Sequence, residues 1–576
     1  MLKCPDLAIA ITIASTLLAS AAVSSPDPAQ NIPVCVQPGN QYQARIVVDG
    51  QGGAIVTWTD YRAADDISIR AQRISPAGEI LWGGAGAEVG RASDFADAGI
   101  PLSDGAGGVF VVWSRRVGAP WPGGEVDLFA QHLGPQGQKL WAADGMSVCT
   151  AREFQLGQDL TSDGAGGLIV SWEDHRELYI GGTAQSDIYA QRLDASGSAL
   201  WTENGVMVCT ADGTQHVPRL VSDDAHGAVV VWADYRAGFG DIYAQRVGPA
   251  GERLWPAEGV SVCVGCRFEG YLQMVPGGEG GAIALWHDGR DPQPPYGTVS
   301  VFAQKLLLSG AVVWPVNGIQ VSPKVVQVAE TRAISDGAGG AMIAWQQNAP
   351  ASLDVANLRA QHIDADGAPL WSIDGVTLDQ TTWQEGTSGL TSDGAGGAFL
   401  AWSKESGIYA RRISKGGSLI GPGAQKISTT DLPNVAPSIC SDGSGGAFVS
   451  WSELRLDDDP HTTQPFIGDL YAGRLLRSGR PPVRPVAQAL GSPEELSNRD
   501  GAIQFSLSEG GPIAIRVFDT SGRCVRRLAP GEFTAGTHRV TAPVTDEGGA
   551  RLRPGVYFYQ LTGASRTQKG RFVILR

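Results

Sequence analysis

A chain of 576 residues with 77 Gly and 34 Pro, but with only 18% charged residues, has the composition of a protein built from many short strands and turns. Its formal net charge of −15 argues against nucleic acid as a partner, because binding to a phosphate backbone requires a basic surface. The length exceeds that of one average domain, so we expect several folding units or a repeat architecture.

The N-terminus has the pattern of a cleavable secretory signal peptide. Lys3 precedes an apolar run from Leu7 to Leu18, and small residues follow at positions 19–22. We therefore expect residues 1–22 to be removed and the mature protein to be secreted, extracellular or held at the outer cell surface. No later apolar run approaches the ~20 residues of a membrane span, which predicts a mature chain without a transmembrane segment.

A Gly-rich turn followed by an apolar strand that ends in Trp occurs eight times between residues 31 and 478. One copy is "DGAGGLIVSW", which ends at Trp172, and a second hairpin follows it in "DIYAQRLDASGSALW", which ends at Trp201. Each repeat thus contains about four strands, and a single sheet of this size cannot cover both of its apolar faces. The sequence predicts an all-β fold, an eight-bladed β-propeller with four-stranded blades, and an open β-solenoid is the competing architecture.

The last repeat lacks a fourth strand. Its third strand is expected at Asp469–Leu475, and no segment of the "GVxVC" type follows. The missing piece is present at the other end of the chain, where "NIPVCV" spans Asn31–Val36. We expect this N-terminal strand to close the last blade, so that no sheet edge is left open where the ring joins.

Two tryptophans depart from the repeat pattern. Fourteen of the 16 Trp recur at fixed repeat positions and are expected to pack between blades, whereas Trp121 and Trp383 lie in connections of one propeller face. The connections of that face vary in length, and variable loops on a constant scaffold are a usual place for recognition. Trp121 and Trp383 are therefore candidates for stacking on a sugar, with local packing as the alternative.

An Asp-x-Arg motif follows the strand-end Trp in four repeats. Carboxylates and guanidiniums around one rim could hold a polar or anionic ligand, whereas salt bridges that lock loops or blades together are the alternative. The candidate ligand-binding pairs are Asp60 and Arg62, Asp174 and Arg176, Asp234 and Arg236, and Asp288 and Arg290.

No motif calls for a cofactor, although Ca²⁺ has a weak candidate site. Asp457, Asp458 and Asp459 form a run of carboxylates of the kind that can bind Ca²⁺, and a solvated loop is the alternative. Cys263 and Cys266 form a single C-x-x-C motif. A local disulfide is one option for this pair, while a metal site of the usual kind would need a second such pair, which the sequence lacks.

The chain changes character after the repeats. A Pro-rich linker is expected at residues 479–496, and "IRVFDTSGRCVRRL", "TAGTHRV" and "PGVYFYQL" follow in order. With these motifs, residues 497–576 resemble the C-terminal Ig-like module of the flagellar hook-capping type and the sorting domains of the type IX secretion pathway. The resemblance implies a small Ig-like β-sandwich that serves secretion or anchoring. Ser497–Ile503 and Thr541–Pro543 depart from the family pattern.

These features predict a secreted or cell-surface binding or scaffold protein. It would recognise protein or glycan through the variable-loop face, and its C-terminal module would be read by secretion machinery. A glycan-degrading hydrolase or lyase on the same face is the alternative, because propellers host such chemistry. No H-E-x-x-H, G-x-S-x-G or phosphate-loop motif occurs, so catalysis is the less expected outcome. A purely structural spacer is the third option.

Overall fold

The structure is a computed structural model, and it forms two compact units, Met1–Pro482 and Val483–Arg576, each of which is described by itself. The residues that the structure describes are 31–63, 66–91, 99–118, 124–176, 185–238, 240–290, 298–349, 352–382, 388–405, 407–430, 434–456, 466–475, 502–507, 511–518, 524–533, 536–541, 545, 555–562 and 567–574. Among them, no helix is long and apolar enough to cross a membrane.

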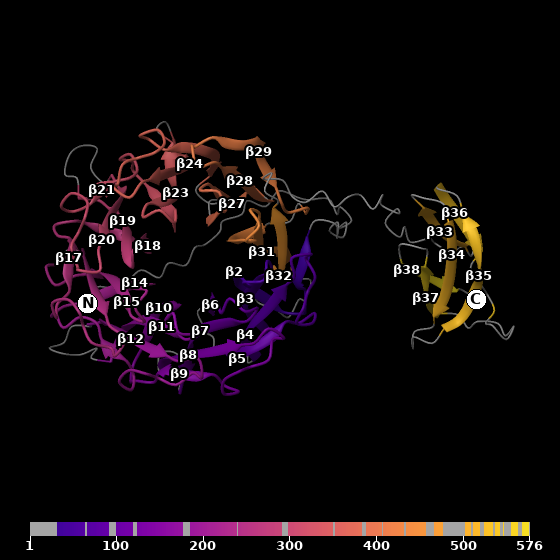
Figure 1. Ribbon diagram of the computed structural model, residues 1–576, viewed down its shortest axis with the longest axis horizontal. Helices are drawn as coiled ribbons and strands as arrows, with labels where there is room; N and C mark the ends of the chain where they lie inside the picture. Colours follow the sequence, from indigo (N-terminus) through magenta and orange to yellow (C-terminus); the bar gives the residue numbers. More distant parts are fainter. Residues whose placement is uncertain are drawn as a thin grey trace. The chain divides into compact units, whose positions relative to one another are not determined.

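The first unit is a ring of eight antiparallel sheets of four strands each (Figure 1), which confirms the eight-bladed β-propeller. Blade one comprises β2 (Asn40–Val48), β3 (Ala54–Ala63), β4 (Asp66–Ile74) and β5 (Ala87–Arg91), and blade two comprises β6 (Ile100–Ser103), β7 (Val109–Val117), β8 (Glu125–Leu133) and β9 (Met146–Cys149). Blade three comprises β10 (Gln155–Ser162), β11 (Leu168–Asp174), β12 (Asp187–Leu193) and β13 (Val206–Met207), and blade four comprises β14 (Gln215–Ser222), β15 (Ala228–Asp234), β16 (Asp241–Val247) and β17 (Val260–Cys263). Blade five comprises β18 (Phe268–Gly278), β19 (Gly281–Asp288), β20 (Ser300–Leu306) and β21 (Ile319–Gln320), and blade six comprises β22 (Val328–Ser335), β23 (Ala341–Ala349), β24 (Ser352–Ile363) and β25 (Val376–Thr382). Blade seven comprises β26 (Ser388–Ser392), β27 (Ala398–Lys404), β28 (Gly407–Ile413) and β29 (Leu419–Lys426), and blade eight comprises β30 (Asn434–Ser441), β31 (Ala447–Leu456), β32 (Phe466–Leu475) and β1 (Ile32–Cys35).

The Gly-rich turn between the first two strands of a blade is held by its aspartate. In blade three, Asp163 Oδ1 accepts hydrogen bonds from the backbone N–H groups of Ala165 and Gly167, at 2.8 and 2.7 Å. Its Oδ2 accepts from Arg192 Nη2 on β12 at 2.9 Å. Gly164 has a φ of +69°, which a residue with a side chain rarely adopts. The recurrence of this turn therefore reflects the hairpin itself.

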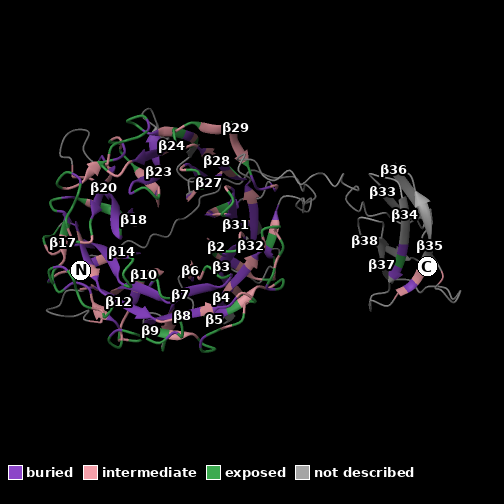
Figure 2. Ribbon diagram, viewed as in Figure 1, coloured by how far each residue is buried: buried purple, intermediate pink, exposed green. Residues whose placement is uncertain are grey.

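Tryptophans provide the packing and much of the bonding between blades. The eight strand-end Trp residues are fully buried, and burial is concentrated in the middle strands of each sheet (Figure 2). The six Trp of the "LW" type and its variants each donate from Nε1 to a backbone oxygen of a turn in the next blade, at 2.9–3.2 Å. The donor and acceptor residues are Trp82 and Pro135, Trp141 and Ala195, Trp201 and Pro249, Trp255 and Leu308, Trp314 and Ala365, and Trp371 and Lys415.

The N-terminal strand closes the ring as expected. β1 pairs antiparallel with β32, with Ile32 opposite Ala472 and Cys35 opposite Leu470. Cys35 ends this strand as Cys149 ends the fourth strand of blade two, so the N-terminal strand is a displaced copy of the repeat's last strand. Blades eight and one also bond directly, because Ile46 N donates to Ser438 Oγ at 3.2 Å.

The first strand of each blade lies on the inner side of the ring (Figure 1). Six of these strands, β2, β10, β14, β18, β22 and β30, carry a register irregularity near their start. At each irregularity a residue has positive φ: Gln43, Gly157, Val217, Gly270 and Tyr271, Glu330, and Ala436. Bulges of this kind change the direction of the side chains that follow and are frequent near functional sites.

The second unit contains two antiparallel sheets in its described part. β33 (Ala502–Leu507) pairs with β36 (Gly536–Thr541). The other sheet has the order β35-β34-β37-β38, formed by Cys524–Phe533, Gly511–Phe518, Gly555–Thr562 and Thr567–Ile574. The Ig-like assignment of this unit stays a prediction. The expected signal peptide (1–22) and linker (479–496) lie outside the described residues.

Candidate functional site

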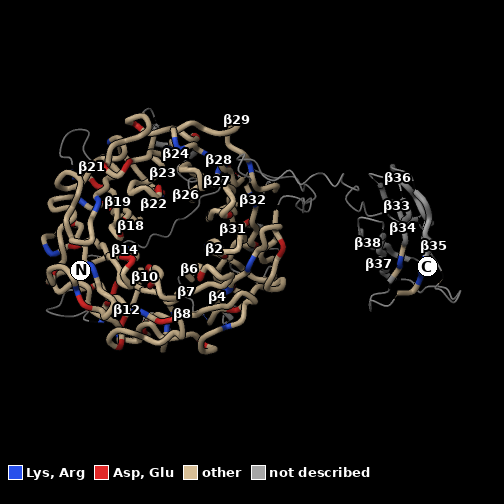
Figure 3. The backbone as a smooth tube through the Cα atoms, in the orientation of Figure 1, with Lys and Arg blue, Asp and Glu red and all other residues tan. Residues whose placement is uncertain are grey.

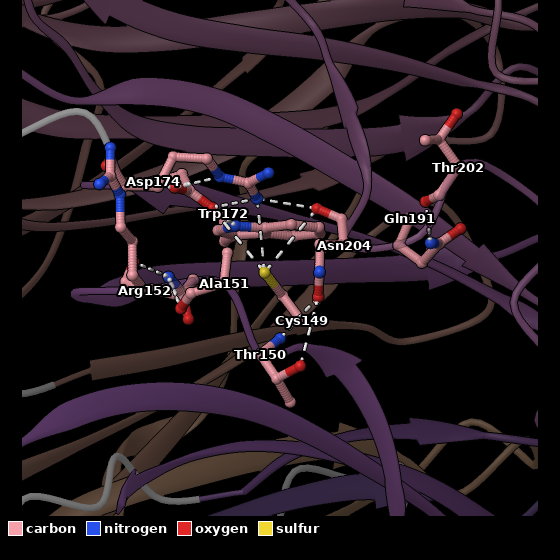
Figure 4. Close-up of polar contacts among 11 residues, drawn as sticks. Cys149, Thr150, Ala151, Arg152, Trp172, Asp174, Gln191, Thr202 and Asn204 are labelled. Carbon is pink, nitrogen blue, oxygen red and sulfur yellow. Dashed lines mark hydrogen bonds and ion pairs between the residues drawn. The ribbon is translucent and has the colours of Figure 1, made fainter.

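The Asp174–Arg176 pair lies inside a hydrogen-bonded cluster between blades two and three, of which Figure 4 labels Cys149, Trp172, Asp174 and Asn204. The Asp174 carboxylate is fully buried and accepts from Trp172 Nε1 at 2.7 Å and from Arg176 Nη2 at 2.7 Å. Arg176 also donates to the Asn204 carbonyl at 2.8 Å and to Cys149 Sγ of the preceding blade at 3.4 Å. The guanidinium therefore connects two blades, and we call this arrangement the Asp–Arg lock.

The lock recurs in blades four and five. Asp234 accepts from Trp232 Nε1 at 2.8 Å and from Arg236 Nη2 at 2.6 Å, and Arg236 donates to Cys209 Sγ at 3.5 Å. In blade five the corresponding bond from Trp286 to Asp288 measures 2.8 Å. The three guanidiniums lie over rings of the third strand, with centroid distances of 3.9–4.2 Å: Arg176 on Tyr189, Arg236 on Tyr243 and Arg290 on Phe302.

The first blade has a variant of the lock. Asp60 is fully buried and pairs with Arg62 at 3.0 Å and with Arg70 at 3.5 Å. In all four pairs the carboxylate is thus shielded from solvent and already bonded within the protein. A ligand could reach only the partly exposed arginines. Ligand binding at these pairs stays a prediction, while the observed contacts are those of the structural alternative.

Three further candidates from the sequence have no structural description. Trp121, Trp383 and the run Asp457, Asp458 and Asp459 all lie outside the described residues. Their proposed roles in sugar stacking and Ca²⁺ binding stay predictions.

One inner-strand position differs in chemistry from blade to blade. At this position, the first strand of a blade pairs in the β-ladder with the residue just before the strand-end Trp of the second strand. In the six blades with a bulge in the first strand, the position follows the bulge. We call the eight residues at this position the inner ring: Arg45, Ile100, Asp159, Arg219, Gln273, Arg332, Gly389 and Ser438. Three arginines and one aspartate make this position cationic, although acidic residues outnumber basic ones in the chain and both kinds are scattered around the propeller (Figure 3).

The inner ring has a carboxylate in blade three. Asp159 is half-buried, and its Oδ2 accepts from Leu220 N of the next blade at 3.2 Å. Burial raises the pKa of Asp159, and the positive charges of Arg219 and Arg45 oppose this rise. Side chains from blades one, three and four therefore share one electrostatic environment. Arg45 is exposed and Arg219 is half-buried, so both are open to solvent.

An aromatic and cationic group lies on the other side of the inner ring, in blades five and six. Tyr271 stacks on His287 with centroids 4.9 Å apart, and the Tyr271 hydroxyl accepts from Arg332. Arg332 also pairs with Glu330 at 3.1 Å. Burial lowers the pKa of His287 to about 4, so this imidazole is neutral near pH 7, and its Nε2 lies 2.7 Å from Thr331 Oγ1. Arg332 is thus held in place by its neighbours.

A third polar group joins blades three and four. Glu173 Oε1 lies 2.9 Å from His175 Nε2 and 2.7 Å from His216 Nδ1. Burial alone would raise the pKa of Glu173, but hydrogen bonds from His175 and His216 outweigh it and hold this pKa at about 2. The carboxylate is therefore ionised at any physiological pH. It is suited to accept hydrogen bonds and poorly suited to donate a proton in catalysis.

Reasoning from the sequence missed the inner ring. Its members are the residues four positions before the aspartate of the Gly-rich turn, or before Gly277, which replaces that aspartate in blade five. Aligning the eight repeats on that turn would have shown a column that contains Arg45, Asp159, Arg219 and Arg332. Recurring charge at one position of the inner strand is the signal that was available.

Comparisons with known proteins find likeness in structure alone. No protein-family model and no curated protein matches the chain. Matching solved structures include a Dyadobacter fermentans protein of unknown function, with 10% identity, a TM-score of 0.30 and coverage of 56% of this chain and 94% of that chain. An α-L-arabinofuranosidase from Fusarium graminearum has 11% identity, a TM-score of 0.33 and coverage of 65% and 91%. PorZ, a surface component of the type IX secretion system of Porphyromonas gingivalis, has 11% identity, a TM-score of 0.23 and coverage of 92% and 81%. At these values the matches carry no inference about function.

Proposed function

We propose that this protein is exported, acts at the cell surface or outside the cell, and binds an anionic glycan through the inner side of its propeller. The observation that carries the proposal is the cationic inner ring in a chain of net charge −15. Guanidiniums form paired hydrogen bonds with carboxylate or sulfate groups, and a local excess of Arg concentrates such ligands against the overall charge.

Solvent access and ring chemistry support this choice of ligand. Arg45 and Arg219 are accessible, and Tyr271 adds a half-buried aromatic ring among the same inner strands. Aromatic rings and guanidiniums together are a common combination for acidic sugars, because the ring contacts the sugar face and the cation contacts its charge. Sugar stacking by Trp121 and Trp383 stays a prediction.

The alternative of a glycan-degrading enzyme has less support among the described residues. Hydrolysis of a glycosidic bond usually requires two carboxyl groups roughly 5–10 Å apart, of which one has a raised pKa. Asp159 has a raised pKa, but Glu269 and Glu330, the other inner-strand carboxylates near described bulges, lie two and three blades further around the ring. We therefore favour binding over hydrolysis.

A glycan array probed with the full mature chain tests the proposed function. We expect binding to uronate-containing or sulfated glycans and no binding to their neutral counterparts. Arg45→Gln and Arg219→Gln should each weaken the Kd about 10-fold, since a hydrogen bond to a charged group contributes about 1.5 kcal/mol. The dependence of Kd on salt should also decrease, because each change removes one charge contact.

Arg253→Gln is the matched control. Arg253 is exposed in a turn between the third and fourth strands of blade four, away from the inner strands. Unchanged glycan binding in the Arg45 and Arg219 variants, or an equal loss in the Arg253 variant, would remove the inner ring from the proposal. Binding to proteins but to no glycan would overturn the ligand class.

We also propose that residues 497–576 serve secretion or anchoring. The order of the three tail motifs and the division of the chain at residue 483 support this role. Deleting residues 483–576 should leave the propeller folded but retained inside the producing cell, as measured by fractionation and surface proteolysis. Equal surface display of the full and shortened chains would contradict the proposal.

A further inference from the structure

The Asp–Arg lock between blades four and five contains a second cysteine. Cys263 ends β17, Cys266 follows three residues later, and Asp288 ends β19 in the next blade. All three are buried, with exposed fractions of 1–3%. Their two sulfur atoms and one carboxylate oxygen lie within 4.8 Å of one another. Two thiols and a carboxylate therefore converge on one point inside the protein.

The locks with one cysteine show what the second cysteine changes. Arg176 and Arg236 donate to Cys149 Sγ and Cys209 Sγ at 3.4 and 3.5 Å (Figure 4 shows the blade-three lock). Within the described residues, Arg290 makes no such bond to Cys263. Instead the Cys266 thiol approaches Cys263 and donates to its carbonyl oxygen at 3.3 Å. The sulfur atoms of Cys263 and Cys266 lie within 4.8 Å of one another.

A second buried carboxylate lies close to Cys266. Asp241 begins β16, is 3% exposed, and places Oδ1 4.0 Å from Cys266 Sγ. The same oxygen accepts the Gly265 N–H at 2.8 Å, which fixes it against the loop that carries Cys266. Among the described residues no salt bridge to Asp241 is found; burial raises the pKa of Asp241, and the positive charge of Arg236 opposes this rise.

We propose that Cys263, Cys266, Asp241 and Asp288 bind one Zn²⁺ ion between blades four and five. Two thiolates favour a borderline-soft ion such as Zn²⁺ over Ca²⁺ or Mg²⁺, which prefer oxygen ligands only. Zn–S and Zn–O lengths of ~2.3 and ~2.1 Å place tetrahedral donors roughly 3.4–3.8 Å apart. The two sulfur atoms and the Asp288 oxygen lie within 4.8 Å of one another, so these three donors need to approach by about 1 Å to meet this geometry. Asp241 is 4.0 Å from Cys266 Sγ and would complete the site by moving toward the other donors.

The neighbouring arginine is compatible with the ion. Asp288 Oδ2 accepts from Trp286 and Arg290, at 2.8 Å from each donor nitrogen. Asp288 Oδ1 accepts a 2.8 Å bond from Arg290 N and a longer 3.3 Å bond from Arg267 N. Coordination of Zn²⁺ through Asp288 Oδ1 replaces the longer hydrogen bond from Arg267 N. The hydrogen bonds of Asp288 with Trp286 and Arg290, which form the lock, are kept. Zn²⁺ binding releases the two thiol protons to solvent, so two thiolates, two carboxylates, Arg290 and the ion leave a net charge of about −1.

Metal content of the full mature chain tests the site. The protein is purified under reducing conditions, incubated with excess Zn²⁺, desalted and measured by mass spectrometry of metals. We expect one Zn²⁺ per chain in the unmodified protein. Cys266→Ser and Cys263→Ser should lose it, and Asp241→Asn should weaken Zn²⁺ affinity about 10-fold or more. Co²⁺ in place of Zn²⁺ should give a thiolate-to-metal absorption band that Cys266→Ser lacks.

Cys209→Ser is the matched control, because Cys209 occupies the same repeat position as Cys263 in a lock without a second cysteine. It should retain one Zn²⁺ per chain and the cobalt band. Circular dichroism establishes that each variant is folded. Absence of Zn²⁺ from the reduced, folded protein overturns the proposal, and so does equal Zn²⁺ in Cys266→Ser. A mass lower by two hydrogens after export, with no metal bound, would show that an external disulfide oxidant joins the two sulfurs instead.

Discussion

Replacing Val34 with Asp is expected to lower the free energy of unfolding of the propeller by about 3 kcal/mol or more, whereas Val36→Asp leaves it nearly unchanged. Val34 is 1% exposed in β1, and Val36, two residues later, is 46% exposed. A lone carboxylate cannot be buried at position 34 without a cost of several kcal/mol, so the strand detaches instead. Detachment loses the burial of Val34 and Cys35, each worth ~1.5 kcal/mol or more, together with the hydrogen bonds to β32.

Urea unfolding followed by Trp fluorescence measures this difference. A detached β1 also leaves the edge of β32 free to pair with another chain, so size-exclusion chromatography should show dimers or larger species for Val34→Asp alone. Identical unfolding curves for the two variants would mean that the N-terminal strand contributes little to ring closure.

Removing the carboxylate of a lock should have a comparable effect. Asp234→Ala leaves the Arg236 guanidinium and the Trp232 indole N–H without their shared acceptor. Loss of one partner of a buried ion pair costs ~3–5 kcal/mol, and we expect about 2–4 kcal/mol here because the Arg236 side chain is 19% exposed. Chemical denaturation of the variant checks the value.

A double-mutant cycle separates a lock from a ligand site. Combining Asp234→Ala with Arg236→Met removes both charges and should recover part of the lost stability, while glycan binding stays as in the unmodified protein. If the pair instead contacts ligand, Arg236→Met alone will weaken glycan binding with little change in stability. That result would support the role predicted from the sequence for the Asp–Arg motifs.

The repeated part of the fold could be predicted from the sequence because every blade buries the same kinds of residues against its neighbours. Each repeat buries one strand-end Trp, such as Trp172 or Trp232. The last repeat lacks its own fourth strand, and this lack pointed to Asn31–Val36 as the strand that replaces it. Local sequence does not tell whether Asp234 is exposed, since its burial depends on neighbouring strands and on Arg236. The Asp–Arg motifs therefore resembled a ligand rim.

The site residues were harder to find for a related physical reason. Arg45, Arg219 and Arg332 occupy one repeat position in three different blades, and that position becomes visible only when the repeats are aligned on the Gly-rich turn. Cys263 and Cys266 could be paired from sequence, but their carboxylate neighbours come from strands on either side. From the sequence, a metal site at this pair was expected to need a second cysteine pair. In the structure, the carboxylates of Asp241 and Asp288 lie near the two cysteines instead.

The exchange of one strand between the two ends has a consequence for synthesis. β1 leaves the ribosome more than four hundred residues before β32, its only β-ladder partner in the structure's described part. At ~5–20 residues per second the delay is roughly 20–90 s, during which seven blades can form while the eighth lacks its last strand. Completion of the toroid therefore waits until β32 has been synthesised, so the first blade remains without its ring neighbour during most of the chain's synthesis.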